Sequence, residues 1–243
     1  RLLASTHPTP RVDPPDSPRR PTALNSRTHL CTLVDANQLE TSNPFGMDDD
    51  CRNCPALCET RTTVVHGYGD VGADFLFVVD APGAGADESG IPAFHDAGGD
   101  RFRRILERCM LCASASPDAE PDLSNAYVTS IARCHHPERD PTDEEVGNCE
   151  PYLNAELRMI NPEILVPVGE RALAEIAAEY TTTPASELSV DEHHATSVRG
   201  RGFELAPMKA PDAMTDDDEQ AFVEFFAELM ASDYRQTKGR RER

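Results

Sequence analysis

Lysine is nearly absent from this chain of 243 residues, since only Lys209 and Lys238 stand beside 21 arginines. Acidic residues number 43, which gives a formal net charge of -20 and a pI of about 4.7. Abundant carboxylates with few lysines are a composition that keeps proteins soluble in concentrated salt. We therefore expect a halophilic archaeon as the source, with an ordinary acidic protein as the alternative. Molar salt screens charge beyond about 3 Å, so this acidity does not exclude a nucleic-acid partner.

Long apolar runs are also missing. No stretch approaches the ~20 apolar residues of a membrane span, and no secretory signal with an apolar centre is visible. These absences predict a cytoplasmic protein without a membrane partner, and we expect it to be a monomer. Disulfide frameworks are typical of exported chains, so the eight cysteines of this chain favour free thiols or a metal site.

The two ends of the chain differ in charge from its middle. The first 33 residues carry five Arg and two Asp, a formal charge of +3, whereas the other 210 carry 18 basic and 41 acidic residues. This contrast and a Pro/Ser/Thr/Arg bias predict a disordered or wrongly translated tail over residues 1–46. Val34 or Met47 is then a candidate start, and a genuine basic tail is the alternative. We expect one folded domain over residues 47–234 and a basic tail over residues 235–243.

Predicted strands and helices alternate along the rest of the chain. Short apolar runs predict strands over residues 74–81, 126–132, 162–169 and 202–207. Helices are predicted over residues 100–112, from Pro141 to about Ile160, from Gly169 to about Tyr180, and behind the acidic residues 216–218. Residues 181–201 are predicted to be a loop. Strands separated by helices predict a four-stranded, mostly parallel sheet between two helical layers, with ligands beyond the carboxyl ends of the strands.

Four cysteines fall into two pairs. Cys51 and Cys54 form a CxxC pair in a loop, Cys134 ends a predicted strand, and Cys149 lies in the predicted helix that follows. A strand, a loop and a helix that packs back on the strand would bring Cys134 and Cys149 together. The CxxC segment would then lie next to this pair. Four thiolates suit a tetrahedral zinc ion or a [4Fe–4S] cluster. The CxxC pair also fits redox chemistry, and buried free thiols are a further alternative.

Several blocks of the sequence, in this order, resemble the family 4 iron–sulfur uracil-DNA glycosylases. They are CRNCPALCETR from residue 51, FLFVVDAPGAGADESGIPAFHDAGG from 75, AYVTSIARCHHP from 126 and PEILVPVGERAL from 162. The resemblance covers about Cys51 to Met230 and implies a three-layer α/β/α sandwich. It also implies hydrolysis of the N-glycosidic bond of uracil, or of another deaminated base in DNA, in base-excision repair. The resemblance further implies a structural [4Fe–4S] cluster on Cys51, Cys54, Cys134 and Cys149.

The loop after the first predicted strand resembles the family's segment that positions water and binds the base. Family members commonly read GEAPG where this chain has Val79-Asp80-Ala81-Pro82-Gly83. The resemblance implies that Asp80 orients the attacking water and that Ala81 lies against the base. Backbone amides that contact the DNA backbone are expected at Gly83, Gly85 and Gly98. Arginines expected to add phosphate contacts are Arg101, Arg103, Arg104 and Arg133.

Three other family positions carry different residues here. Ala93 stands where the family's PFVGxAG segment has the Phe that stacks on uracil, and Phe94 follows one place later. Ser130 replaces an Asn whose amide reads the uracil edge, and Ala210 stands at the His of the family's HPS segment, beside Lys209. Losing one donor to developing charge typically costs ~10²–10³ in rate. These changes predict weakened or redirected excision unless Phe94 stacks and Lys209 donates. Further candidate donors are His95, His135 and His136.

Three alternatives follow from these departures. The first is a catalytically silent DNA- or damage-binding iron–sulfur protein of the same fold. The second is a glycosylase of altered base specificity, for xanthine or hypoxanthine. The third is a zinc or redox-type thiol protein without a DNA role.

Overall fold

The computed structural model describes residues 40–113 and 119–234. The predictions for residues 1–39 and for the basic tail over 235–243 lie outside the described residues.

The folded domain begins earlier than residue 47. Ser42 forms a β-bridge with Tyr68, and the Asn43 backbone N–H donates to the Gly67 carbonyl at 3.0 Å. The Phe45 ring lies 6.0 Å from the ring of Tyr127. The predicted tail over residues 1–46 therefore ends too late. Phe45 is the only large apolar residue in the stretch TSNPFG, which leaves no pattern from which these contacts could be predicted.

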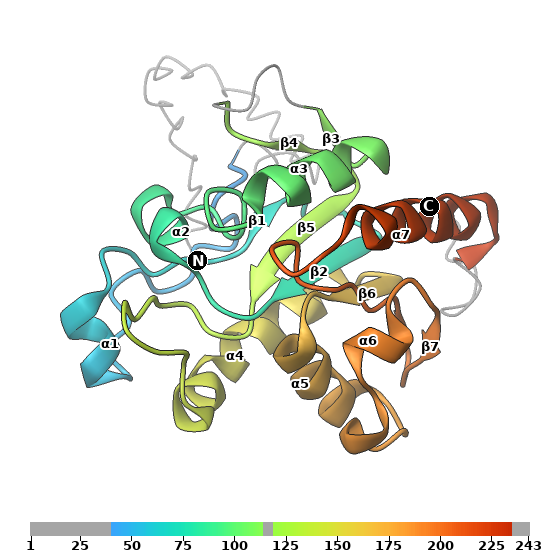
Figure 1. Ribbon diagram of the computed structural model, residues 1–243. Coiled ribbons are helices and arrows are strands. Elements are labelled where there is room, and N and C mark those ends of the chain that lie inside the picture. Colours follow the sequence, from blue (N-terminus) through green and yellow to red (C-terminus); the bar gives the residue numbers. More distant parts are fainter. Residues whose placement is uncertain (1–39, 114–118, 235–243) are drawn as a thin grey trace, which may run out of the picture. The chain divides into compact units, whose positions relative to one another are not determined.

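A six-stranded sheet forms the centre of the domain, in the order β1-β5-β2-β6-β8-β7 (Figure 1). Its inner strands run parallel and are the four predicted ones: β5 (Ala126–Ser130), β2 (Phe75–Val79), β6 (Ile164–Pro167) and β8 (Glu204–Leu205). The antiparallel edges are β1 (Tyr68–Gly69) and β7 (Val198–Arg199). The mostly parallel sheet is confirmed, whereas the count of four strands is wrong because two-residue edge strands leave no period in the sequence.

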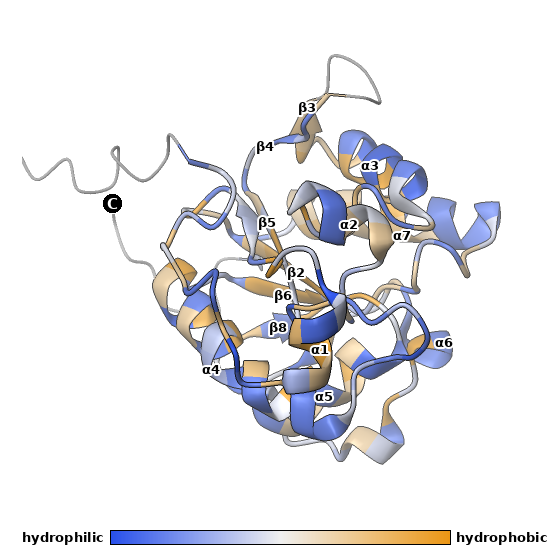
Figure 2. Cartoon of the chain, turned by 90° about the vertical axis from the view of Figure 1, so that its left-hand side faces the viewer, coloured by the Kyte–Doolittle hydropathy of each residue, from blue (hydrophilic) through white to orange (hydrophobic). Residues whose placement is uncertain are grey.

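Helices cover both faces of this sheet. The helices of one layer are α3 (Gly99–Arg108) and α7 (Asp216–Ala231), and those of the other are α4 (Asp143–Ile160) and α5 (Glu170–Tyr180). Phe75, Phe77 and Val79 pack with α3 and α7, whereas Leu76 and Val78 pack with α4 and α5, because successive strand residues point to opposite faces. Figure 2 shows the strands in hydrophobic colours between the two layers. No described helix is long and apolar enough to cross a membrane.

Two long helices begin at capping boxes close to their predicted starts. Thr142 Oγ1 accepts from the Glu145 N–H at 3.3 Å, while the Thr142 N–H donates to Glu145 at 2.8 Å. Thr215 and Asp218 repeat the arrangement before α7. The acidic residues in both first turns also interact favourably with the helix dipole.

Several short elements depart from the prediction. The helix predicted over residues 100–112 ends at Arg108, since Met110 adopts a φ of +60° and Cys112 enters the small hairpin of β3 (Cys112–Ala113) and β4 (Asp122–Leu123). Helical segments of three to six residues were not predicted, because they show less than two turns of period. They are α1 (Pro55–Thr60), α2 (Ala84–Ser89), the 3-10 helix η1 (Ala185–Glu187) and α6 (Val190–His193). The last two and β7 replace the loop predicted over residues 181–201.

Candidate active site and thiol cluster

The four cysteines of the predicted ligand set lie close together and are buried. Cys51 and Cys54 precede α1, Cys134 follows β5, and Cys149 lies in α4. Burial raises the pKa of the Cys134 thiol to about 11 and also raises the pKa values of Cys54 and Cys149. The nearby Cys51 thiol raises the pKa of each of these three further. The two pairs predicted from sequence are therefore brought to one place.

Each of the four sulfurs has its own hydrogen-bonding partner. The partners come from the end of α1, from the end of β5 and from α4, so every segment that carries a thiol also supplies a donor. The four pairs are Arg61 Nη1 with Cys134 at 3.2 Å, Asn148 Nδ2 with Cys54 at 3.4 Å, the Arg133 backbone N–H with Cys149, and the Tyr152 hydroxyl with Cys51.

The four cysteines are the residues of the site that could hold a metal group. Within residues 40–113 and 119–234, no three His, Cys, Asp or Glu side chains are placed to hold a metal ion. Thiolates are ligands of zinc and of iron–sulfur clusters alike. Four buried thiols with donors to sulfur could hold such a group.

The sequence alone did not predict that the side chains of Arg61, Asn148 and Tyr152 donate to the cysteine sulfurs. Arg61 ends the CRNCPALCETR block, and Asn148 and Tyr152 flank Cys149 in the helix. Proximity to a predicted ligand was the available signal, but it does not say which side chain turns toward sulfur. The donors therefore became visible only in the structure.

Asp80 lies just beyond the carboxyl end of β2, beside a pocket of about 510 Å³. Its Oδ1 is buried and has no hydrogen-bond partner among the described residues. Burial raises the pKa of this carboxyl, and Arg171 partly opposes the rise. Parallel sheets bind ligands at this edge, and Asp80 is one of the residues that line the pocket there.

Two histidines line the same pocket. The His135 Nδ1–H donates to the Pro82 carbonyl at 3.0 Å, which fixes the ring against the loop that carries Asp80. The His136 Nδ1 accepts from the Glu138 N–H at 3.2 Å. Both rings thus keep their Nε2 atoms for other partners. Of the predicted catalytic and base-binding residues that the structure describes, Asp80 and Ala81 line this pocket, whereas Phe94, Ser130 and Lys209 do not.

The Gly-rich segment after Asp80 folds back on itself rather than forming an open loop. The N–H groups of Gly83 and Ala86 both donate to the Asp96 carboxylate at 2.9 Å. A Cβ on Gly85 would lie 1.9 Å from the His95 carbonyl oxygen, so this position requires glycine. The Gly83 amide predicted to contact DNA is thus already bonded to Asp96.

Gly98 joins this segment to the C-terminal part of the site. It has a φ of +80°, and a Cβ there would lie 2.6 Å from the Asp212 backbone nitrogen. Glycine therefore allows the start of α3 to pack directly against residues 211–212, next to Ala210.

Phe94 and Ser130 both lie below the surface. The Phe94 ring is 3% exposed, lies 5.2 Å from Phe102 and has the Arg103 guanidinium 5.5 Å above it. Ser130 is fully buried, and its hydroxyl has no partner among the described residues. Phe94 must therefore move to stack on a base, and the unpaired hydroxyl of Ser130 at the carboxyl end of β5 must become accessible before it can contact one.

Lys209 is held by two carboxylates. Its ammonium lies 2.8 Å from Asp218 and 3.4 Å from Asp191, and its backbone N–H donates to His194 at 3.0 Å. Ala210 follows beside Gly169. A role for Lys209 as donor to a leaving base thus requires that it exchange these carboxylates for the substrate.

Arg133 does not face solvent, so the prediction that it contacts DNA is wrong. Its guanidinium is 1% exposed and pairs with Glu156 at 3.0 and 2.7 Å. Glu156 also accepts from Thr129 at 2.5 Å and from Tyr127 at 3.2 Å. The partner lies 23 residues further along the chain, which is why the sequence alone suggested an exposed arginine.

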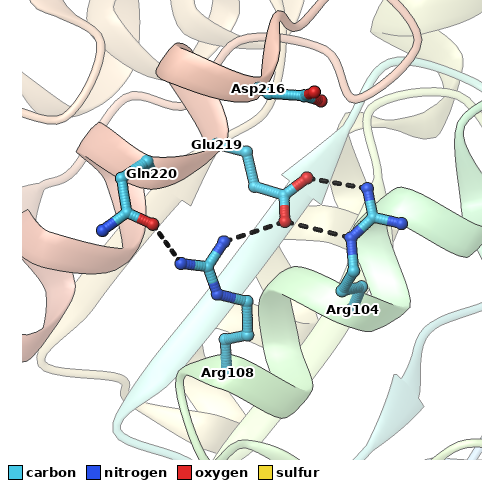
Figure 3. Close-up of a pocket in the computed structure, with 5 residues that line it drawn as sticks. All are labelled: Arg104, Arg108, Asp216, Glu219 and Gln220. Carbon is cyan, nitrogen blue, oxygen red and sulfur yellow. Dashed lines mark hydrogen bonds and ion pairs between the residues drawn. The ribbon is translucent and has the colours of Figure 1, made fainter.

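Three of the four arginines of α3 bind α7 instead of standing free for phosphate, and the fourth, Arg103, lies over the Phe94 ring. Arg104 donates to Glu219 at 3.0 and 2.8 Å, and Arg108 donates to the same carboxylate at 2.9 Å (Figure 3). Arg101 lies 3.0 Å from Asp216. The hydrogen bond from Arg104 is the largest cause that lowers the pKa of Glu219 to about 2. We call this set the α3–α7 ion-pair network.

A parallel α/β sheet with a half-buried carboxylate and a pocket at its carboxyl edge is typical of proteins that bind a ligand there, and here four clustered thiols lie close by. The chain belongs to the uracil DNA glycosylase superfamily, whose family model matches residues 66–230.

Two type-4 uracil-DNA glycosylases illustrate the similarity. The protein of Sulfurisphaera tokodaii is 29% identical over 154 residues, which cover 63% of this chain and 61% of that protein. The protein of Archaeoglobus fulgidus is 37% identical over 123 residues, covering 50% and 56%. The chain thus spans less than two thirds of either relative. A type-5 uracil-DNA glycosylase of Pyrobaculum aerophilum is 27% identical over 213 residues, covering 77% of this chain and 92% of that protein.

Proposed function

We propose that this protein is a DNA glycosylase of base-excision repair, which hydrolyses the N-glycosidic bond of uracil or another deaminated base. The observation that carries the proposal is Asp80, a half-buried carboxylate beside the pocket at the edge of the sheet, with one buried oxygen that has no partner among the described residues. It occupies this place in a chain of the uracil DNA glycosylase superfamily, which includes the type-4 and type-5 relatives.

In the proposed reaction, the target base is flipped out of the DNA stack and bound near Ala81. The Asp80 carboxylate orients a water molecule and accepts a proton from it as the water oxygen bonds to C1′. The C1′–N bond breaks, and its electron pair leaves with the base as an anion that is then protonated. Burial raises the pKa of Asp80, which makes the carboxylate a better proton acceptor.

The residues proposed to bind the base differ in the contacts that they make in the folded protein. Ser130 has an unpaired hydroxyl that could bond to the edge of a base, once a change in the surrounding loops exposes it. Phe94 would have to turn out of the protein interior, and Lys209 would have to leave Asp218 and Asp191. His136 is a second candidate donor in the pocket, because its bond with the Glu138 N–H uses Nδ1 and not Nε2.

We also propose that Cys51, Cys54, Cys134 and Cys149 hold a [4Fe–4S] cluster. When bound, the cluster would be a rigid cross-link that joins the segment before α1, the end of β5 and α4. The type-4 relatives, the four buried thiols and their four donors support this assignment.

The commitment of Phe94 and Lys209 to internal contacts favours a second candidate function. In it, the protein binds deaminated DNA without turnover, as a catalytically silent protein of the same fold. A glycosylase for xanthine or hypoxanthine lies between the two candidates.

The test is an excision assay on single- and double-stranded DNA that contains uracil, xanthine or hypoxanthine. It is run on the monomer fraction, in dilute buffer and in molar KCl, with Asp80→Asn as the matched control. Abasic product from the wild type, at least 100-fold above the control, supports the proposed activity. Binding of uracil DNA without product supports the silent protein instead.

A further inference from the structure

Arg61 lies at the end of α1 and reaches two thiol-bearing segments at once. Its Nη1 donates to Cys134 Sγ at 3.2 Å, and its Nη2 donates to the Cys51 carbonyl. Cys134 lies 73 residues away along the chain. In Figure 1, α1 lies beside the segment that follows β5, and Thr60 donates to the His135 carbonyl at 3.2 Å. One side chain therefore joins the CxxC segment to the end of β5.

The charge of Arg61 is directed at sulfur rather than at a carboxylate. None of the ion pairs found among the described residues includes Arg61, although the chain carries 43 acidic residues. The neighbouring Arg133 guanidinium is neutralised by Glu156. Because a guanidinium does not lose its proton in proteins, Arg61 is a permanent positive charge at the thiols.

The other donors act differently. Asn148 and Tyr152 are neutral, and the Arg133 donor to Cys149 is a backbone N–H. None of these three links the segment before α1 to the end of β5. Arg61 thus combines a charge, a hydrogen bond to sulfur and a connection between segments.

We propose that Arg61 is a positioning residue of the iron–sulfur site, which fixes Cys51 relative to Cys134 and raises the reduction potential of the bound cluster. The inference rests on the cluster proposed above. Hydrogen bonds to cluster sulfurs and nearby positive charge stabilise the reduced, more negative form, and thereby raise the potential. Residues that orient metal ligands typically contribute 10–100-fold to metal retention.

The test compares Arg61→Gln and Arg61→Lys with the wild type and with Arg52→Gln. Arg52 lies between Cys51 and Cys54 and is exposed, so its replacement removes the same formal charge without removing a donor to sulfur. Iron and sulfide per chain, the reduction potential and the rate of bleaching near 400 nm under chelator are measured on the whole protein. Uracil excision is measured separately.

Arg61→Gln is expected to lose its cluster about 10-fold faster or more and to have a lower reduction potential. Arg61→Lys, which keeps the charge without the planar fork, is expected to lie between it and the wild type, and Arg52→Gln to match the wild type. If Arg61→Gln does not fold, Arg61→Lys carries the same comparison. Equal retention and potential in the Arg61 variants and the wild type overturn the role of Arg61 alone. A wild type without iron and sulfide overturns the cluster as well.

Discussion

Asp80 carries a charge that its environment disfavours. Burial disfavours the ionised carboxylate, and one of its oxygens has no partner among the described residues. A folded-state pKa above the unfolded value means that the folded chain binds the proton more tightly. The ionised side chain therefore costs stability, and that cost falls as the pH drops through the raised pKa.

Asp80→Asn should accordingly unfold at a higher temperature than the wild type at pH 7. It replaces a partly buried charge with a neutral side chain of similar size. Its excision rate should fall at least 100-fold, since no proton acceptor is left. In the wild type, excision should decline on the acid side at a higher pH than an ordinary aspartate would give. Calorimetry and a pH–rate profile measure these effects. A variant that is less stable than the wild type would show that the carboxylate is satisfied in the fold.

Glu156 presents the opposite case, a buried charge with every partner in place. Glu156→Gln leaves the fully buried Arg133 without its counter-charge, which typically costs about 3–5 kcal/mol of unfolding free energy. Urea titration measures the loss. The double variant Arg133→Met/Glu156→Leu should recover part of it, because removing both charges avoids the unpaired one. If the single and double variants lose equal stability, the loss comes from the contacts of Glu156 with Gly67, Thr129 and Tyr127.

At the scale of elements, the α3–α7 ion-pair network connects two helices. The first follows the Gly-rich segment, and the second begins at Asp216, a few residues after Lys209 and Ala210. It centres on Glu219, and the start of α3 packs at Gly98 against residues 211–212. The position of Lys209 and Ala210 relative to the Gly-rich segment therefore depends on how firmly α7 holds α3.

Glu219→Gln should lower the unfolding free energy by about 1–3 kcal/mol at pH 7, since its arginine partners are only partly exposed. The pKa of Glu219 is lowered from 4.5 to about 2. Its contribution is therefore present above pH 4.5 and lost as the pH falls toward 2. Chemical unfolding between pH 7 and 2.5 measures this, with the exposed Glu228→Gln of α7 as control. Equal losses for both variants would contradict the assignment.

The main strands and helices could be predicted from the sequence alone, whereas several side-chain contacts could not. The parallel strands and long helices were predicted because Phe75–Val79 and Ile164–Pro167 are apolar throughout and because Thr142 and the acids after Thr215 are clear helix starts. The cysteine set was predicted from spacing and resemblance. Arg133 was assigned to the surface because its partner lies in a helix far along the chain. The internal contacts of Phe94 and Lys209 likewise depend on tertiary packing, which no local pattern records.

At the scale of the whole molecule, the net charge of -20 opposes compaction in dilute buffer. The Debye length falls from about 10 Å at 0.1 M salt to about 3 Å at 1 M. The same screening weakens the α3–α7 ion-pair network. Because the repulsion involves many more charges than this network, salt should stabilise the folded protein overall.

The melting temperature and any excision activity should therefore rise between 0.1 and 2 M KCl. Thermal unfolding across this range tests the balance, with glucose of equal osmolarity as a control for water activity. A melting temperature that falls with salt would mean that specific ion pairs dominate, as in an ordinary acidic protein.

The spacing of the four thiols sets a waiting time during synthesis. Cys51 and Cys54 leave the ribosome long before Cys134, and Cys149 follows Cys54 by 95 residues. At roughly 5–20 residues per second, the first two thiols stay without their partners for about 5–20 s. During that interval they are open to oxidation or to premature capture of a metal ion. The nascent chain thus depends on a reducing environment well before the four thiols can hold the proposed cluster.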